Sequence, residues 1–187
     1  MTKVAIFIAD GTEETEAITP ADILRRAGIT ADLISVKEGS NTITASRGVV
    51  ITADMNISDI DIDSYDMLVL PGGIAGTNNL KAASKLTDAL VRFNDLGKGV
   101  AAICAAPTIL SSLGLLNGVK ATCNPGFWDT LRSDGADLVK DEIAVISGNK
   151  ITSQAMGTSA AFGLAMLEYL TDRETALDMA DKICYKL

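Results

Sequence analysis

Short apolar runs alternate along the chain with segments of helical periodicity. The runs are continuous, which is typical of strands buried on both faces of a sheet. The predicted strands are residues 3–9, 31–36, 67–70, 100–104 and 120–123. The predicted helices are residues 13–27, 84–96, 107–113, 159–170 and 173–183, with a kink at Pro20 in the first and a cap on the fourth from Thr158 or Ser159. This alternation predicts an α/β fold with a mostly parallel sheet covered on both faces.

Two further segments predict hairpins. Residues 43–52 alternate between apolar and polar positions, and the apolar runs 143–146 and 151–153 flank the turn-forming sequence Ser147-Gly148-Asn149. The 187 residues contain no linker, repeat or low-complexity tract, so we expect one domain over residues 1–187.

Charge and composition exclude several classes of protein. The net charge of −8 argues against a nucleic acid or an anionic membrane surface as partner. Three cysteines make no disulfide framework, and the first apolar run is too short for a secretion signal, so a cytoplasmic location is expected. Residues 99–119 are uncharged over a membrane-spanning length, but they contain Pro107 and change from a strand pattern to a helix pattern, which indicates core.

The chain contains no histidine. This excludes a Cys-His or Ser-His couple within one chain and a histidine-ligated zinc ion. We therefore expect neither a metal nor an organic cofactor. An activated nucleophile would depend on a carboxyl group or on backbone dipoles.

Cys104 ends an apolar strand and is followed directly by a predicted helix. Such a strand-to-helix turn exposes the side chain at the sheet edge beside helix-N-terminal amides, which favour the reactive thiolate. The alternative is a buried structural cysteine, since free cysteines are among the most buried residues. Cys123 is interpreted mainly as structural, with a resolving role for an oxidised Cys104 as the alternative.

Four predicted strands end at the same edge of the sheet, and candidate functional residues lie at each of these ends. They are Asp10-Gly11, Pro71-Gly72-Gly73, Cys104 and Asn124. Gly72 and Gly73 would let the backbone approach the sulfur and donate an N–H to an oxyanion, although an ordinary tight turn is the alternative. The glutamates at this edge argue against a phosphate cradle.

Glu16 lies one turn into the first helix, at the same edge. In apolar surroundings it would have a raised pKa, stay protonated, donate a hydrogen bond to a thiolate and move a proton during turnover. The alternative is an ordinary surface glutamate. Arg26 and Arg47 are surface charges or part of an anion pocket.

Six segments together resemble the ThiJ/PfpI superfamily, in order over nearly the whole chain. They are Gly11–Glu16, Ile23–Gly28, Ala45-Ser46-Arg47, Leu70–Gly73, Ala102–Pro107 and Gly157-Thr158-Ser159. Within the superfamily, the chain is most similar to the branch of DJ-one, a Parkinson-disease-associated protein deglycase. The resemblance implies a flavodoxin-like fold, shared with class I glutamine amidotransferases, in which a mostly parallel sheet is sandwiched between helices. It also implies a homodimer.

The resemblance also implies roles for individual residues. Cys104 would be the reactive, oxidisable cysteine, Glu16 its protonated partner, and the amides of Gly73 and Cys104 the oxyanion donors. The pocket would be lined by Gly72, Ala105, Asn124, Arg26 and Arg47, with Arg47 reaching across the dimer.

Two classes of function follow from the resemblance. The first is an enzyme of carbonyl stress: a glutathione-independent glyoxalase that converts methylglyoxal to lactate, with glyoxal as a further substrate, or a deglycase. The second is a redox sensor or chaperone whose Cys104 is oxidised to a sulfinate. Two departures matter, because Asn124-Pro125 stands where many members have a histidine before proline, and Ala105-Ala106-Pro107 where they have Ala-Gly-Pro. Asparagine is not a general base, which argues against protease or amidase activity and weakens the glyoxalase interpretation.

Overall fold

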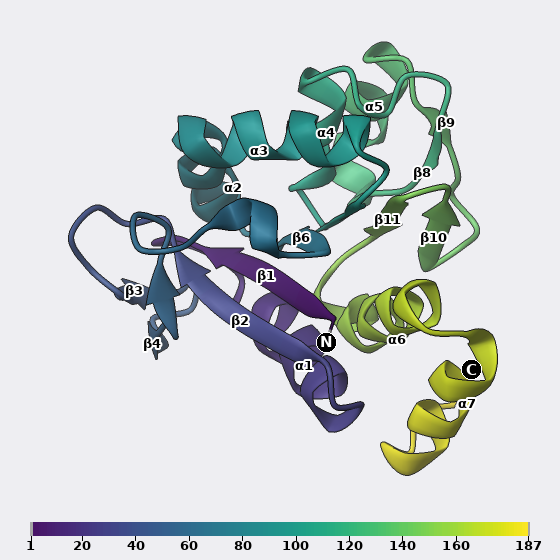
Figure 1. Cartoon of the computed structure of the whole chain (residues 1–187). Helices are drawn as coiled ribbons and strands as arrows, with labels where there is room; N and C mark the ends of the chain where they lie inside the picture. The colour runs from purple at the N-terminus through teal and green to yellow at the C-terminus, as the bar shows by residue number, and fades with distance from the viewer. Residues whose placement is uncertain (1, 187) are drawn as a thin grey trace.

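A seven-stranded sheet runs through the middle of the molecule, in a computed structural model that describes residues 2–186 (Figure 1). Its strands are β1 (Lys3–Ile8), β2 (Thr30–Ser35), β5 (Met55–Asn56), β6 (Met67–Leu70), β7 (Gly99–Ile103), β10 (Ala144–Ser147) and β11 (Lys150–Ser153). Their order is β10-β11-β7-β6-β1-β2-β5, and every neighbouring pair is parallel except β10 with β11. The mostly parallel α/β architecture predicted from the sequence is therefore confirmed.

Helices cover both faces of the sheet. One face carries α1 (Glu14–Arg26) and α6 (Ser159–Leu170), with α7 (Arg173–Lys182) packed on α6; the other carries α2 (Ile74–Ala82), α3 (Ser84–Asp95), α4 (Pro107–Ser112) and α5 (Trp128–Ser133) (Figure 1). Successive residues of β1 contribute to opposite layers. Ile6 packs with Leu24 and Phe162 on one side, and Phe7 packs with Phe93 on the other. Both faces are apolar because side chains alternate along a strand.

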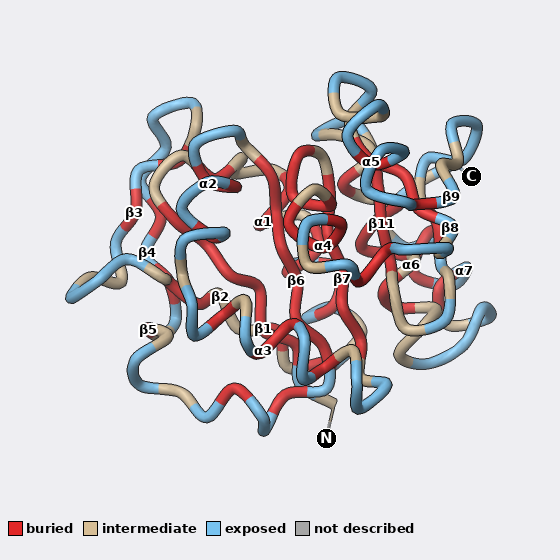
Figure 2. Tube along the Cα trace, turned by 90° about the horizontal axis from the view of Figure 1, so that it is seen from above, coloured by how far each residue is buried: buried red, intermediate tan, exposed pale blue. Residues whose placement is uncertain are grey.

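The central strands are the most deeply buried part of the chain. In Figure 2 the tube is red along β1, β6 and β7, while the connecting loops are pale blue. All the residues of β6 and β7 are buried, which explains why both appear in the sequence as uninterrupted apolar runs. Among the described residues, no helix is long and apolar enough to cross a membrane.

Both predicted hairpins are present. β3 (Thr42–Thr44) and β4 (Val50–Thr52) form a separate antiparallel pair, whereas β10 and β11 extend the main sheet. The predicted strand 120–123 is shorter: β8 (Lys120–Ala121) pairs with β9 (Asp137–Leu138) outside the main sheet. It ends early because the next amide, that of Thr122, donates to the Thr152 hydroxyl instead of to a strand carbonyl.

Some helical details differ from the prediction. α1 continues through Pro20 and is followed by Gly28 at φ +79°, as expected. Thr158 precedes α6 but does not cap it, because its hydroxyl accepts from the amides of Gln154 and Ala155. Three short 3-10 helices complete the fold: η1 (Ile62–Ser64), η2 (Pro125–Phe127) and η3 (Met156–Thr158).

Candidate functional site

Cys104 forms the turn between β7 and α4. Its φ is +66°, a left-handed backbone conformation that residues other than glycine rarely adopt. The amide of Cys104 donates to the Ser153 carbonyl of β11 at 3.1 Å, which fixes the turn to the sheet. The side chain is half-buried at the edge where β6 and β7 end. Backbone strain of this kind is concentrated at functional sites.

Glu16 reaches the same edge from the first turn of α1. The carboxylate of Glu13 caps the helix by accepting from the Glu16 amide at 2.9 Å. The Glu16 side chain is completely buried, and its Oε2 accepts from the Gly72 amide at 2.8 Å. Oε1 is buried without a well-formed hydrogen bond. A buried carboxylate oxygen without a donor is destabilising, so this arrangement favours the protonated carboxyl group.

The pKa values of Glu16 and Cys104 reflect burial and their proximity. Burial raises the pKa of Glu16 to about 7, although hydrogen bonds from Gly72 and Cys104 oppose the rise. Burial, followed by the charge of the Glu16 carboxylate, raises the pKa of Cys104 to about 12, against the backbone amides of Gly73 and Ala105. The backbone amides favour the thiolate, as expected for this turn, but burial and the Glu16 charge outweigh them.

The proton shared by Glu16 and Cys104 decides which group is charged. With Glu16 ionised, its charge suppresses the thiolate; with Glu16 protonated, that repulsion is absent and the carboxyl can donate to the sulfur. The two groups titrate as a coupled pair, in which a single negative charge is placed on the carboxylate or on the sulfur. Glu16 is thus in a position to hold a proton next to Cys104 near neutral pH.

The predicted oxyanion donors need one correction. The amide of Cys104 is engaged by Ser153 and is not free to bind an oxyanion. The backbone amides that act on the Cys104 sulfur are those of Gly73 and Ala105. We therefore assign the donor role to Gly73 and Ala105. The sequence could not reveal this, because the partner of the Cys104 amide lies on a strand about fifty residues further along the chain.

Gly72 and Gly73 are glycines for different reasons. A Cβ on Gly72 would lie 2.6 Å from Glu16 Oε2 and 2.7 Å from the Cβ of Cys104, so only glycine leaves room for both side chains. Gly73 has φ +84°, and a Cβ there would collide with the backbone of Gly11 and Glu13. The glycines thus allow the loop after β6 to approach the start of α1, where the Glu13 amide donates to the Gly72 carbonyl at 2.9 Å.

Replacing Gly72 by Ala is expected to lower the free energy of unfolding by about 1–3 kcal/mol, since overpacking displaces groups that cannot move freely. Denaturant unfolding of wild type and Gly72→Ala measures this. Gly157→Ala is the matched control: neither Gly72 nor Gly157 has a positive φ, and a Cβ on Gly157 would meet no atom within 4 Å. Equal stability of Gly72→Ala and wild type would contradict the crowding inferred at Gly72.

Asn124 and Cys123 lie beside Cys104. The Asn124 amide donates to the Cys104 carbonyl at 2.9 Å, and its side-chain oxygen accepts from the Gly126 amide. Asn124 is half-buried, and Cys123 is fully buried with its thiol directed to the Asn124 carbonyl. Asn124 lies next to Cys104, as predicted, although β8, the strand that precedes Asn124, is not part of the main sheet.

The two predicted arginines lie elsewhere. Arg26 is exposed, pairs with Asp22 at 2.6 Å, and follows Glu16 by ten residues of α1, a rise of about 15 Å. Arg47 is exposed on the loop between β3 and β4, where its amide donates to the Glu14 carboxylate at 3.3 Å. Within one chain, the structure does not bring Arg26 to Cys104, and it places the Arg47 backbone beside the beginning of α1.

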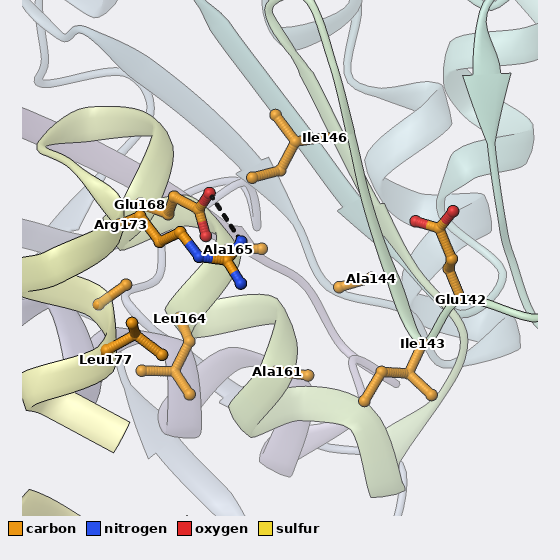
Figure 3. A pocket seen from close by; sticks show the side chains of 11 residues that line it. Glu142, Ile143, Ala144, Ile146, Ala161, Leu164, Ala165, Glu168, Arg173 and Leu177 are labelled. Carbon is orange, nitrogen blue, oxygen red and sulfur yellow. Dashed lines mark ion pairs between the residues drawn. The ribbon is translucent and has the colours of Figure 1, made fainter. Parts of the chain in front are cut away.

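A cleft of about 360 Å³ lies at a different place, between β10, α6 and α7 (Figure 3). Its walls are mainly apolar, with Ile143 and Leu164 on facing elements, and the Glu168–Arg173 pair at 3.9 Å on one side. No residue of the Cys104 site lines it. The sequence analysis did not predict this cleft, since its lining residues share no motif. Residues 2–186 hold no cluster of three or more potential metal ligands.

Comparison with known proteins finds similar sequences and structures over nearly the whole chain. A family model described as the DJ-1/PfpI family matches residues 2–169. The chain is 38% identical to the protein dj-1beta of Drosophila melanogaster, over 96% of each chain, and 34% identical to a protein of Pyrococcus abyssi named as a deglycase, over 83% of this chain and 91% of that one. The structure matches Toxoplasma gondii DJ-1, oxidized, with a TM-score of 0.93, 33% identity and full coverage of both chains. The chain belongs to the DJ-1/PfpI family.

Proposed function

We propose that this protein converts small α-oxoaldehydes, with methylglyoxal as the model substrate, to hydroxy acids without glutathione. One observation carries the proposal: the completely buried carboxyl group of Glu16 lies beside the side chain of Cys104, which forms a strained turn. Burial raises the pKa of Glu16 to about 7. A general acid–base group works best when its pKa lies near the operating pH. The relative named as a deglycase supports chemistry on reactive carbonyl compounds.

The reaction begins from protonated Glu16 and the Cys104 thiolate. The sulfur attacks the aldehyde carbon, and the new oxyanion is stabilised by the Gly73 and Ala105 amides before it takes the proton of Glu16. The product of this step is a hemithioacetal next to a Glu16 carboxylate.

Glu16 then moves a proton between adjacent carbons. Its carboxylate removes the hydrogen of the former aldehyde carbon, giving an enediolate, and returns the proton to the neighbouring carbon. The hydroxyl proton on the first carbon passes to the second oxygen, which leaves a lactoyl thioester on Cys104. Water cleaves the carbon–sulfur bond and releases lactate, which restores the Cys104 thiolate. Of the two protons set free, one returns to the Glu16 carboxylate and one passes to solvent. The cycle needs no histidine, so the absence of histidine from this chain is compatible with it.

Redox sensing is a second candidate function. The matched Toxoplasma structure is described as oxidized, which favours this candidate. Two equivalents of peroxide would convert the Cys104 thiolate to a sulfinate and two waters. The same Gly73 and Ala105 amides and the protonated Glu16 would hold the sulfinate oxygens, so the geometry serves either function.

Lactate production from methylglyoxal tests the first function, and the intact mass after peroxide treatment tests the second. We expect wild type to form lactate. The rate of lactate formation by Cys104→Ser should fall to background, because an unactivated serine hydroxyl is a much weaker nucleophile than a cysteine thiolate. Cys184→Ser is the matched control, since Cys184 is an exposed thiol with a positive φ far along the chain. Lactate formation that persists in Cys104→Ser would refute the enzymatic mechanism. Addition of two oxygens that depends on Cys104, without turnover, would favour the sensor.

A further inference from the structure

We propose that Cys123 is the resolving cysteine of this site and forms a reversible disulfide with Cys104 after peroxide has oxidised Cys104. The inference rests on the proposed reactivity of Cys104, and it adds a specific partner. The sequence alone does not decide for this role, because Cys104 and Cys123 lie in different segments of the fold. The argument comes from the backbone contact between the two segments.

The two cysteines are neighbours through a backbone hydrogen bond. The amide of Asn124, the residue after Cys123, donates to the Cys104 carbonyl at 2.9 Å. Strand residues joined by such a bond have Cα atoms about 4.5–5.5 Å apart. Here the bond joins Cys104 to Asn124, so the Cys123 backbone lies one residue from this contact. A disulfide requires a Cα separation of about 4.4–6.8 Å, which a local shift of this segment would bring within reach.

The thiols also influence each other. Burial raises the pKa of Cys123 to about 12, and the charge of Cys104 contributes to the rise. Oxidation of Cys104 to a neutral sulfenic acid removes that charge and makes the Cys123 thiol easier to ionise. The oxidised site thus activates its own resolving group.

Bond formation requires a local movement of Cys123. Its side chain packs with the layer that contains Ala106, whereas Cys104 packs with the opposite layer. The thiol is held only by a weak donation to the Asn124 carbonyl at 3.3 Å. Pro125 and Gly126, which follow, are exposed, so the turn after Cys123 is the part of this segment that can shift, although the Cys123 carbonyl must then release the Trp128 Nε1 donor at 3.1 Å.

The chemistry balances with peroxide as the oxidant. The Cys104 thiolate and one peroxide molecule give a sulfenic acid and hydroxide, so sulfur is oxidised and peroxide is reduced. The Cys123 sulfur attacks the sulfenic sulfur, the S–S bond forms as the S–O bond breaks, and water leaves. A second peroxide molecule competes by oxidising the sulfenic acid to the sulfinate. Cys123 therefore protects Cys104 at low peroxide.

The experiment treats the reduced full-length protein with two molar equivalents of hydrogen peroxide, which is enough for either the disulfide or the sulfinate. It then blocks remaining thiols under denaturing conditions and measures intact mass and peptide cross-links. We expect wild type to lose two hydrogens and to yield a Cys104–Cys123 peptide pair that a dithiol reductant cleaves. Cys123→Ser should instead gain two oxygens on Cys104. Cys184→Ser should behave as wild type. Circular dichroism confirms that each variant is folded, and Cys123→Ala replaces Cys123→Ser if the serine variant does not fold.

Two results would overturn the inference in distinguishable ways. A wild type that gains two oxygens as fast as Cys123→Ser, without a cross-linked peptide, would refute the resolving role and leave the reactivity of Cys104 intact. A wild type without any Cys104-dependent mass change would refute both. A cross-link from Cys104 to Cys184 would assign the resolving role to the wrong cysteine and would also refute the proposal.

Discussion

Replacing Glu16 by Gln is expected to lower kcat/KM for methylglyoxal about 10²- to 10⁴-fold, the usual contribution of a positioned acid–base group. Gln is nearly isosteric with a protonated Glu. Its oxygen can accept from the Gly72 amide, as Glu16 Oε2 does at 2.8 Å, and its NH₂ group can donate to the Cys104 sulfur. The amide cannot carry a proton between two carbons, so turnover is lost while the thiolate remains stabilised.

The same variant separates the two candidate functions. Glu16→Gln should still be oxidised at Cys104 by peroxide, as judged by intact mass, because oxidation needs the thiolate and not the proton transfer. Glu14→Gln removes a carboxylate from the same helical turn but outside the site, and it should leave both properties unchanged. Lactate formation by Glu16→Gln at the rate of wild type would refute the role of Glu16 in proton transfer.

The stability of the protein should decrease as the pH rises from about 5 to about 7.5, and the Glu16→Gln variant should lack this decrease. The folded-state pKa of Glu16 is raised from 4.5 to about 7, so between these values the folded state binds more protons than the unfolded state. The free energy of unfolding then falls with increasing pH. The shift corresponds to a loss on the order of 3–4 kcal/mol once Glu16 is ionised in both states.

Urea unfolding of wild type and Glu16→Gln under reducing conditions at pH 5, 6, 7 and 8 measures this difference. The stability gained by protonation is fully present below the unfolded-state pKa and is lost as the pH passes the folded-state pKa. We therefore expect the variant to gain on wild type at each step up in pH. Curves that stay parallel over the whole range would contradict the raised pKa of Glu16.

The sequence was most informative where burial is complete. β6 and β7 are buried at every position, so each leaves an uninterrupted apolar run that ends at a turn. That ending placed Cys104 at a strand-to-helix turn, and the helical register placed Glu16 at the same edge. By contrast, β5 and β9 have only two residues each, which is too few to produce a period.

The missed features depend on contacts between distant segments. α2 was interpreted only as a glycine-rich turn, because its helix begins directly after Gly73 and exposes Ile74. Ser153 takes the Cys104 amide through the register of β11 with β7, which no local pattern encodes. Arg26 was expected near the pocket, but the length of α1 carries it away. Local pattern thus identified the reacting groups, and tertiary register decided which backbone groups serve them.

The left-handed conformation of Cys104 has a consequence for the evolution and engineering of this chain. A residue with a side chain is destabilised there by roughly 1–2 kcal/mol relative to glycine. A glycine at position 104 would make the folded protein more stable but would remove the candidate nucleophile. Selection for stability alone would therefore favour glycine, and the proposed reactivity of Cys104 would account for a thiol kept at this cost.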